Sequence, residues 1–139
     1  MSTCLKISDA AALALHTVDY LVRNSERFVA NQEIAAALSV SANHLAKVHQ
    51  RLVHTGLVFA VRGPGGGFRL AKPAGEITLL SVMEAVDGPF TPSRCLLGRP
   101  ECSRATCILG DLSADINERV RTFFTNTTVS QLSLDTPIL

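Results

Sequence analysis

The chain has 139 residues, of which 47% are hydrophobic and 18% are charged, and its net charge is +1. This composition predicts one compact domain with a well-filled core and excludes the disordered class of proteins. Because no apolar run is long enough to cross a bilayer and the N-terminus lacks the basic flank of a signal peptide, we expect a cytoplasmic protein with no membrane partner.

Charge is distributed unevenly along the chain. No Asp or Glu occurs between Glu33 and Glu76, and the five Lys and Arg residues in that stretch give it a charge of +5. Three histidines in the same stretch, His44, His49 and His54, could add to this charge. The remaining eight basic and twelve acidic residues give the rest of the chain a charge of −4. A local positive field of this kind is typical of a protein that binds a polyanion.

The N-terminal part of the chain predicts two helices. Ser8 or Asp9 can cap the first helix, and Asn31 is expected to cap a short second helix at 32–38. Apolar residues repeat at helical spacing in the first helix, so we expect them to face the core. These inward residues are Leu15, Val18 and Val22.

A third helix is predicted from Ser41, as its cap, to about His54. Leu45, Val48 and Leu52 fall at positions i, i+3 and i+7, so one face is expected to be buried. The other face is polar and basic, with Asn43, His44, Lys47, Gln50 and Arg51. Two short helices joined by a tight turn, with the second basic on its open face, predict a helix-turn-helix.

A β-hairpin is predicted directly after this helix. Two runs rich in β-forming residues, 57–61 and 68–70, flank the connection Arg62-Gly-Pro-Gly-Gly-Gly. The glycines suit a sharp turn or a close approach to another surface. A helix-turn-helix followed by a glycine-rich hairpin with arginines at both feet has the order of a winged helix.

The partner predicted for this module is double-stranded DNA. The third helix would enter the major groove and contact base edges, while the hairpin would follow the adjacent backbone or minor groove. Arg62 is the minor-groove candidate, because a narrow groove attracts arginine, and Ser41 and Arg51 are expected to contact phosphates. The predicted DNA-binding residues are Ser41, Asn43, His44, Lys47, Arg51, Arg62, Gly63, Gly65, Gly66 and Arg69.

The segment that follows combines a short helix with an irregular cysteine-rich stretch. Residues 78–88 predict an amphipathic helix with a structural role, and 89–107 show no periodicity. Three cysteines in that stretch suggest soft-metal ligation by iron–sulfur or zinc, because intracellular thiols are normally reduced. Incidental or redox-active thiols are the alternative. The predicted metal ligands are Cys95, Cys102 and Cys107.

A long helix is predicted from Ile108 to about Phe124, followed by a short terminal helix that packs back on the domain. The long helix follows an already complete winged module, so its apolar stripe predicts a subunit interface and a homodimer. We therefore divide the chain into a DNA-binding part at 1–75, a sensor part at 76–107 and a dimerisation part at 108–139. The predicted interface residues are Leu109, Leu112, Ile116, Val120 and Phe123.

Together these features resemble the Rrf-two-type repressors, the family of the iron–sulfur regulator IscR and the nitric-oxide sensor NsrR. The resemblance covers nearly the whole chain and rests on the order of elements, the wing sequence VRGPGGGFRL at 61–70, the three-cysteine loop, the long helix and the closing Thr-Val-Ser-Gln-Leu. It implies a mainly α fold with a small β-hairpin wing. It also implies a homodimeric transcriptional repressor rather than an enzyme.

The resemblance further implies an iron–sulfur cluster, of the 2Fe-2S or 4Fe-4S type, that controls DNA affinity in response to redox, nitric oxide or iron–sulfur status. Cys95, Cys102 and Cys107 match the family's cluster ligands. The gaps between them are six and four residues, whereas family members commonly have five in both, and Gly110 replaces a histidine that some members carry. The fourth ligand stays open. In nitric-oxide-sensing members an Asp near the N-terminus of the partner subunit fills this role, and the partner subunit's Asp9 stands at that place, with a simple helix cap as its alternative role. Cys4 is a less favoured donor that would make the site all-thiolate.

Two other functions fit the same residues. The cysteines could bind zinc or form a thiol-redox switch without a cluster, and the winged helix could be a protein-interaction module. No arrangement of a nucleophile with a base, and no pair of carboxylates, suggests an enzyme.

Overall fold

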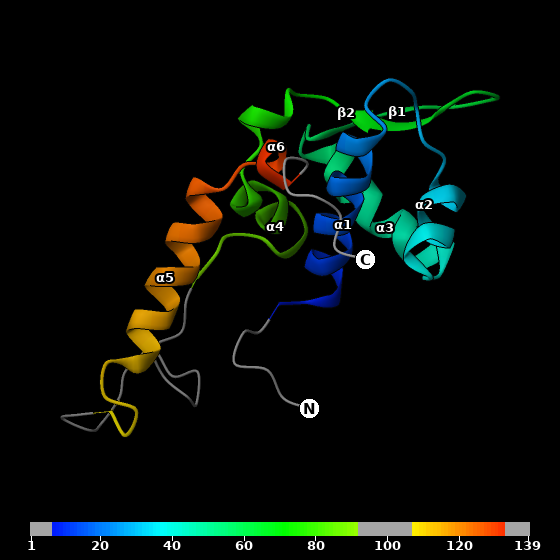
Figure 1. Ribbon diagram of the computed structural model, residues 1–139. Coiled ribbons are helices and arrows are strands. Elements are labelled where there is room, and N and C mark those ends of the chain that lie inside the picture. Colours follow the sequence, from blue (N-terminus) through cyan, green and yellow to red (C-terminus); the bar gives the residue numbers. More distant parts are fainter. Residues whose placement is uncertain (1–6, 92–106, 133–139) are drawn as a thin grey trace.

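A computed structural model of the protein describes residues 7–91 and 107–132. This part of the chain has the mainly α fold with a two-stranded hairpin that the sequence predicts. Figure 1 shows the hairpin with α2 and α3 on one side of α1, and α4, α6 and a projecting α5 on the other. The elements, in order, are α1 (Asp9–Arg23), α2 (Asn31–Leu38), α3 (Ala42–His54), β1 (Val58–Val61), β2 (Gly67–Leu70), a 3-10 turn (Ala74–Glu76), α4 (Leu79–Asp87), α5 (Leu112–Asn126) and α6 (Val129–Leu132).

The core is built around α1, which packs against both α3 and α4. The predicted inward face of α1 is partly wrong, because Leu15 and Val22 are only half-buried and Val18 alone of the three is fully buried. Ala11 and Ala14 face the core instead, together with Leu21. Small residues at these positions let neighbouring helices approach closely, which a count of large apolar side chains does not detect.

The predicted caps of α1 and α3 are confirmed at Ser8 and Ser41. The Ser8 Oγ accepts a hydrogen bond from the Ala11 N–H at 3.0 Å, and the Ser41 Oγ accepts one from the His44 N–H at 3.4 Å. Asp9 is therefore the first residue inside α1 rather than its cap.

The predicted cap of α2 is wrong. Asn31 is the first helical residue, and the cap position is occupied by Ala30, whose side chain makes no capping bond. The Asn31 amide instead donates to the Ala42 carbonyl at 2.9 Å, at the start of α3. A longer-range bond between the two helices has thus replaced a local cap, and it helps to set the angle of the helix-turn-helix.

The hairpin packs on the rest of the fold, and its second strand also pairs with the segment before α2. β1 pairs with β2 in an antiparallel register that places Phe59 opposite Arg69. The Phe68 N–H donates to the Val29 carbonyl at 2.8 Å, and the Val29 N–H donates to the Phe68 carbonyl at 2.9 Å. Gly67, just before this bridge, has φ of +141°, and a Cβ there would lie 2.4 Å from the Val29 carbonyl oxygen. The close approach of two backbones explains this glycine.

Helix α5 starts later than predicted, at Leu112 rather than Ile108. Residues 108–111 form a turn in which Gly110 has φ of +59°, and the Leu112 N–H donates to the Leu109 carbonyl at 3.2 Å. Glycine weakens a helix and tolerates this left-handed backbone, so the helix begins after it.

Helix α6 packs back on the domain as predicted. Val129 is fully buried, and its N–H donates to the Ile77 carbonyl at 2.8 Å. The core thus includes residues from both ends of the described chain, from Ala11 to Val129. No helix within residues 7–91 and 107–132 is long and apolar enough to span a membrane.

Candidate nucleic-acid interface and sensor residues

The solvent-facing side of α3 carries the residues predicted to read base edges. Asn43, His44 and Lys47 are exposed, whereas Leu45, Val48 and Leu52 on the opposite face are buried. Two further exposed residues continue the same stripe along the helix, and sequence reasoning did not assign them to the site. They are Gln50 and His54. Their spacing of three and seven residues from Lys47 could have placed them on the same helix face from the sequence.

His49, in the same helix, does not contribute to the positive field, although its position in the sequence places it among the histidines that could add positive charge. It is fully buried, its Nε2 lies 3.2 Å from the Thr17 Oγ1, and its ring lies 4.5 Å from that of Phe68 in the wing. Desolvation by burial lowers the His49 pKa to about 4, so the ring is neutral at pH 7. His49 is a packing residue that joins α1, α3 and the hairpin.

Acid is expected to destabilise the protein through His49. A folded pKa of about 4 below an unfolded value near 6.5 means that the unfolded chain binds the proton first. Stability is therefore fully present above pH 6.5 and falls as the pH drops towards 4, by about 2 kcal/mol between pH 7 and pH 5. Urea unfolding at the two pH values measures this difference. His49→Gln should abolish most of it, and an unchanged pH dependence in that variant would contradict the assignment.

The tip of the hairpin projects beyond the body of the fold (Figure 1). Arg62, Gly63 and Gly65 are exposed, and both glycines have positive φ, +92° and +76°. A Cβ at Gly66 would lie 2.3 Å from the Val61 carbonyl oxygen, so the loop turns back closely on the first strand. A thin loop of this kind, with one arginine at its base, has the shape needed to enter a narrow groove.

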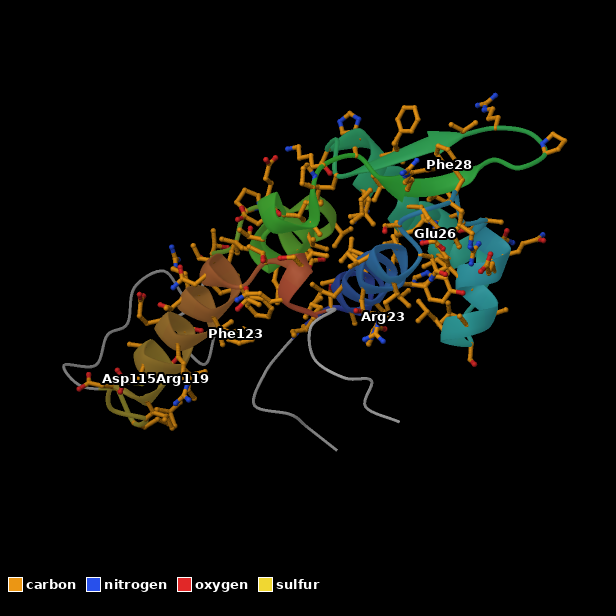
Figure 2. The ribbon with its side chains drawn as sticks, turned by 45° about the horizontal axis from the view of Figure 1, so that its top comes forward. Arg23, Glu26, Phe28, Asp115, Arg119 and Phe123 are labelled. Atoms are coloured by element: carbon orange, nitrogen blue, oxygen red, sulfur yellow. The ribbon has the colours of Figure 1, made fainter. Side chains whose placement is uncertain are left out.

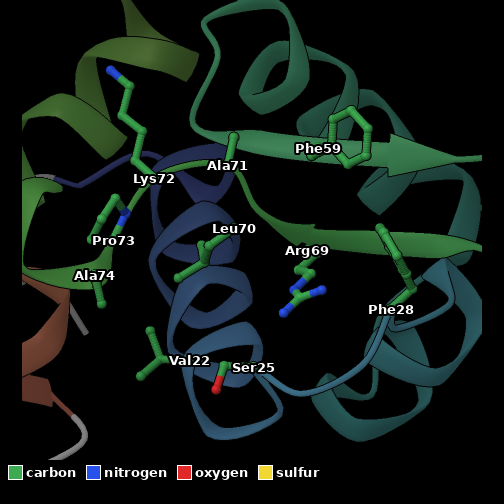
Figure 3. A pocket seen from close by; sticks show the side chains of 10 residues that line it. All are labelled: Val22, Ser25, Phe28, Phe59, Arg69, Leu70, Ala71, Lys72, Pro73 and Ala74. Atoms are coloured by element: carbon green, nitrogen blue, oxygen red, sulfur yellow. The ribbon is translucent and has the colours of Figure 1, made fainter.

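The structure separates Arg69 from the other predicted DNA-binding residues. Phe68 packs towards α3, against His49, and side chains alternate along a strand, so Arg69 lies on the opposite face of the hairpin. Its guanidinium carbon lies 5.8 Å from the centre of the Phe28 ring. Figure 3 shows both side chains at a hollow of about 680 Å³ behind the hairpin, beside the end of α1.

Arg51 is also engaged within the protein. Its Nη1 donates a hydrogen bond to the carbonyl of Val86, in the last turn of α4. The side chain borders a shallow hollow shared with Lys47, Gln50 and His54. Arg51 therefore lies at the margin of the predicted DNA-binding surface and is held there by α4.

Only some of the predicted metal ligands lie among the described residues. Cys95 and Cys102 lie outside the described residues, and Cys107 is a free, half-buried thiol whose Sγ accepts a hydrogen bond from the Leu109 N–H at 3.5 Å. Asp9 is exposed in the first turn of α1, and Ser8 performs the capping that was its alternative role. Within residues 7–91 and 107–132, no three acidic, His or Cys side chains lie close enough to hold a metal.

The turn before α5 and the helix itself expose an apolar stripe. Phe123 is 59% exposed and Leu112 is 54% exposed, and Leu109 and Ile116 are exposed to a smaller extent, while Val120 is half-buried. Phe124 is the buried residue of this helix in the described structure. Figure 2 shows Phe123 on the same projecting helix as Asp115 and Arg119. Such a run of large apolar side chains on a protruding helix marks an interaction surface.

A helix-turn-helix followed directly by a β-hairpin wing is an architecture of DNA-binding transcriptional regulators. A family model for Rrf2, described as an iron-dependent transcriptional regulator, matches residues 7–135. The chain belongs to the Rrf2 family, and it is a regulator rather than an enzyme.

Named relatives are transcriptional regulators, and solved structures share the fold. The chain is 34% identical over 128 residues to a putative HTH-type transcriptional regulator of Aquifex aeolicus, with 90% of this chain and 89% of the relative covered. It is 34% identical to the HTH-type transcriptional regulator IscR of Serratia proteamaculans, with 83% and 70% covered. Its fold matches CymR, the global cysteine regulator of B. subtilis, with a TM-score of 0.79, 24% identity and 96% and 99% covered. It also matches T. potens IscR, with a TM-score of 0.74, 18% identity and 95% and 88% covered.

Proposed function

We propose that the chain is a homodimeric transcriptional repressor whose operator affinity is controlled by an iron–sulfur cluster. The observation that carries this proposal is the position of the free Cys107 thiol. It lies at the foot of the exposed stripe of α5, at the end of the three-cysteine segment that follows α4. Along the sequence, the three cysteines thus lie between the DNA-binding module and the helix that carries the exposed stripe.

The exposed stripe supports the homodimer. DNA-binding helix-turn-helix proteins commonly dimerise so that two recognition helices reach successive half-sites. A second copy of α5 would bury the apolar side chains that one copy leaves exposed, among them Leu112 and Phe123. Two antiparallel or crossed α5 helices would then fix the spacing of the two copies of α3.

The donor set fits an iron–sulfur cluster. Thiolates are the usual cluster ligands, and a carboxylate is a harder donor than a thiolate. Cys95, Cys102 and Cys107 would hold the cluster together with the partner subunit's Asp9. The Cys107 thiol is free, and Asp9 is exposed in the first turn of α1, where Ser8 provides the cap. When bound, the cluster would supply an iron centre that reacts with oxidants or nitric oxide.

Protein purified without oxygen tests the cluster directly. We expect broad absorption between about 320 and 460 nm with iron and acid-labile sulfide present. The Cys102→Ala variant should lose the absorption and both elements. A colourless wild-type protein that cannot be reconstituted would refute the cluster.

A thiol-redox switch without a cluster is the second candidate. The free, half-buried Cys107 favours it, and structures matched by this fold include an oxidised form of Staphylococcus aureus CymR. Under this alternative, metal analysis would find no iron or sulfide, and an oxidant would change operator affinity in a way that a thiol reductant reverses.

Replacing Lys47 with Met is expected to weaken DNA binding at low salt and to reduce its salt dependence. Each phosphate neutralised by a cation contributes about 0.9 to the slope of log affinity against log salt concentration, so the slope should fall by about that amount. Titrations of a selected duplex at several salt concentrations measure the slope. The uncharged control Asn43→Ala should leave the slope unchanged. If wild-type protein shows no salt-dependent binding, a protein partner replaces DNA in this account.

A further inference from the structure

The last turn of α4 is a junction between three functional parts of the chain. Arg51, in the recognition helix, donates a hydrogen bond to the Val86 carbonyl there. Ser8, at the start of α1, donates to the neighbouring Asp87, whose two carboxylate oxygens lie 2.8 and 2.7 Å from its Oγ. Gly88 then ends the helix with φ of +80°, and the cysteine segment follows.

The contact made by Arg51 has a physical reason within the fold. Carbonyls in the last turn of a helix lack partners inside that helix, and the negative end of the helix dipole attracts a cation. Helix α4 has no basic residue in its last turn, so Arg51 supplies this cation from α3. A hydrogen bond from a charged donor is stronger than a neutral one and fixes the position of the helix that carries it.

We propose that Arg51 is a positioning residue that couples the end of α4 to the recognition helix, rather than a contact to DNA phosphate. This inference rests on the proposed function, because it names the connection through which the sensor residues alter operator affinity. Asp9 is adjacent to Ser8, and the cysteine segment leaves the same turn of α4. A shift of that turn moves the hydrogen-bond acceptors of Arg51 in α3 and of Ser8 at the start of α1, and so changes how both helices are held.

The two roles of Arg51 predict different salt dependences. A phosphate contact contributes to the slope of log affinity against log salt concentration, whereas a contact to a helix carbonyl does not. A positioning residue instead affects how much the operator affinity of cluster-loaded protein differs from that of cluster-free protein. The ratio of these two affinities measures the effect. Ratios of about 5 to 150 are usual for coupled sites.

The test is to measure both quantities for Arg51→Met, which keeps the aliphatic stem and removes the donors. The probe is a duplex selected from a random pool by wild-type protein, titrated with cluster-loaded and cluster-free protein at several salt concentrations. We expect the salt slope to stay at the wild-type value and the affinity ratio to fall to within about twofold of one. Lys47→Met serves as the matched control, with a reduced slope and an unchanged ratio.

Circular dichroism tests whether Arg51→Met folds, and absorbance tests whether it binds the cluster. If the variant fails either test, Arg51→Lys replaces it in the experiment. Lysine keeps the charge that a phosphate contact needs but lacks the planar fork of donors, so a positioning role predicts a reduced ratio here too. A slope that falls by about 0.9 with an unchanged ratio would overturn the proposal. Equal affinities of loaded and cluster-free wild-type protein would instead refute the proposed function, and this coupling with it.

Discussion

Replacing Phe123 with Glu is expected to convert the proposed dimer to a monomer and to weaken operator binding by about a hundredfold or more. Phe123 is 59% exposed on α5 and is the aromatic residue of the apolar stripe. A carboxylate at this position would be buried without a partner when two copies associate, which costs several kcal/mol. A monomer binds only one half-site. Linking two half-site contacts commonly raises the overall affinity by a factor of 10² to 10⁴, and this gain is lost with the dimer.

Light scattering on the eluted protein gives the oligomeric state, and titration of the duplex selected by wild-type protein gives the affinity. Thr125→Glu is the matched control, because it introduces the same charge at an exposed position on another side of α5. The control should remain dimeric. A dimer that persists in Phe123→Glu would place the subunit interface elsewhere.

Replacing Gly67 with Ala is expected to lower the free energy of unfolding by about 2 to 4 kcal/mol. The backbone φ of +141° is accessible to glycine, and the added Cβ would lie 2.4 Å from the Val29 carbonyl oxygen and 2.9 Å from the Ala30 nitrogen. Both contacts are with backbone atoms, which cannot rotate away. Relief of the clash would separate β2 from the segment that enters α2.

Urea unfolding of Gly67→Ala and Gly63→Ala measures the contrast. Gly63 also has a positive φ, of +92°, but a Cβ there would meet no atom within 4 Å. Its replacement should cost only the backbone strain, about 1 kcal/mol. Equal losses of stability in the two variants would show that the approach of Val29 to the hairpin does not constrain the wing.

The parts of the fold that sequence predicts correctly are those set by neighbours in the chain. Ser41 and Ser8 cap helices because their hydroxyls reach N–H groups three residues away. The hairpin forms where two β-forming runs flank a glycine-rich connection. These interactions are local, so spacing and residue type are sufficient to predict them.

The errors arise where distant segments compete for a side chain. Asn31 bonds to the Ala42 carbonyl rather than capping its own helix, and His49 is buried against Thr17 and Phe68. Sequence also did not show that Arg51 meets a carbonyl 35 residues away, although its contact with DNA stays a prediction. The contact of Arg69 with DNA likewise stays a prediction, but strand alternation after the inward-facing Phe68 would have placed it on the far face of the hairpin.

The sensor part was predicted by residue chemistry rather than by geometry. Spacing alone left iron–sulfur, zinc and thiol oxidation open for Cys95, Cys102 and Cys107, because flexible loops can bring thiols together from many separations. The structure adds that Cys107 is a free thiol and that Asp9 is not the cap of α1. Both residues therefore stay proposed ligands.

The most direct measurement is the operator affinity of one anaerobic preparation before and after removal of its iron. Fluorescence anisotropy with the duplex selected by wild-type protein gives both dissociation constants under the same salt conditions. Control by a cluster predicts that the two values differ by about 5- to 150-fold, and that reconstitution with iron and sulfide restores the first. Two equal dissociation constants, in a preparation shown to have lost its iron, would contradict the account.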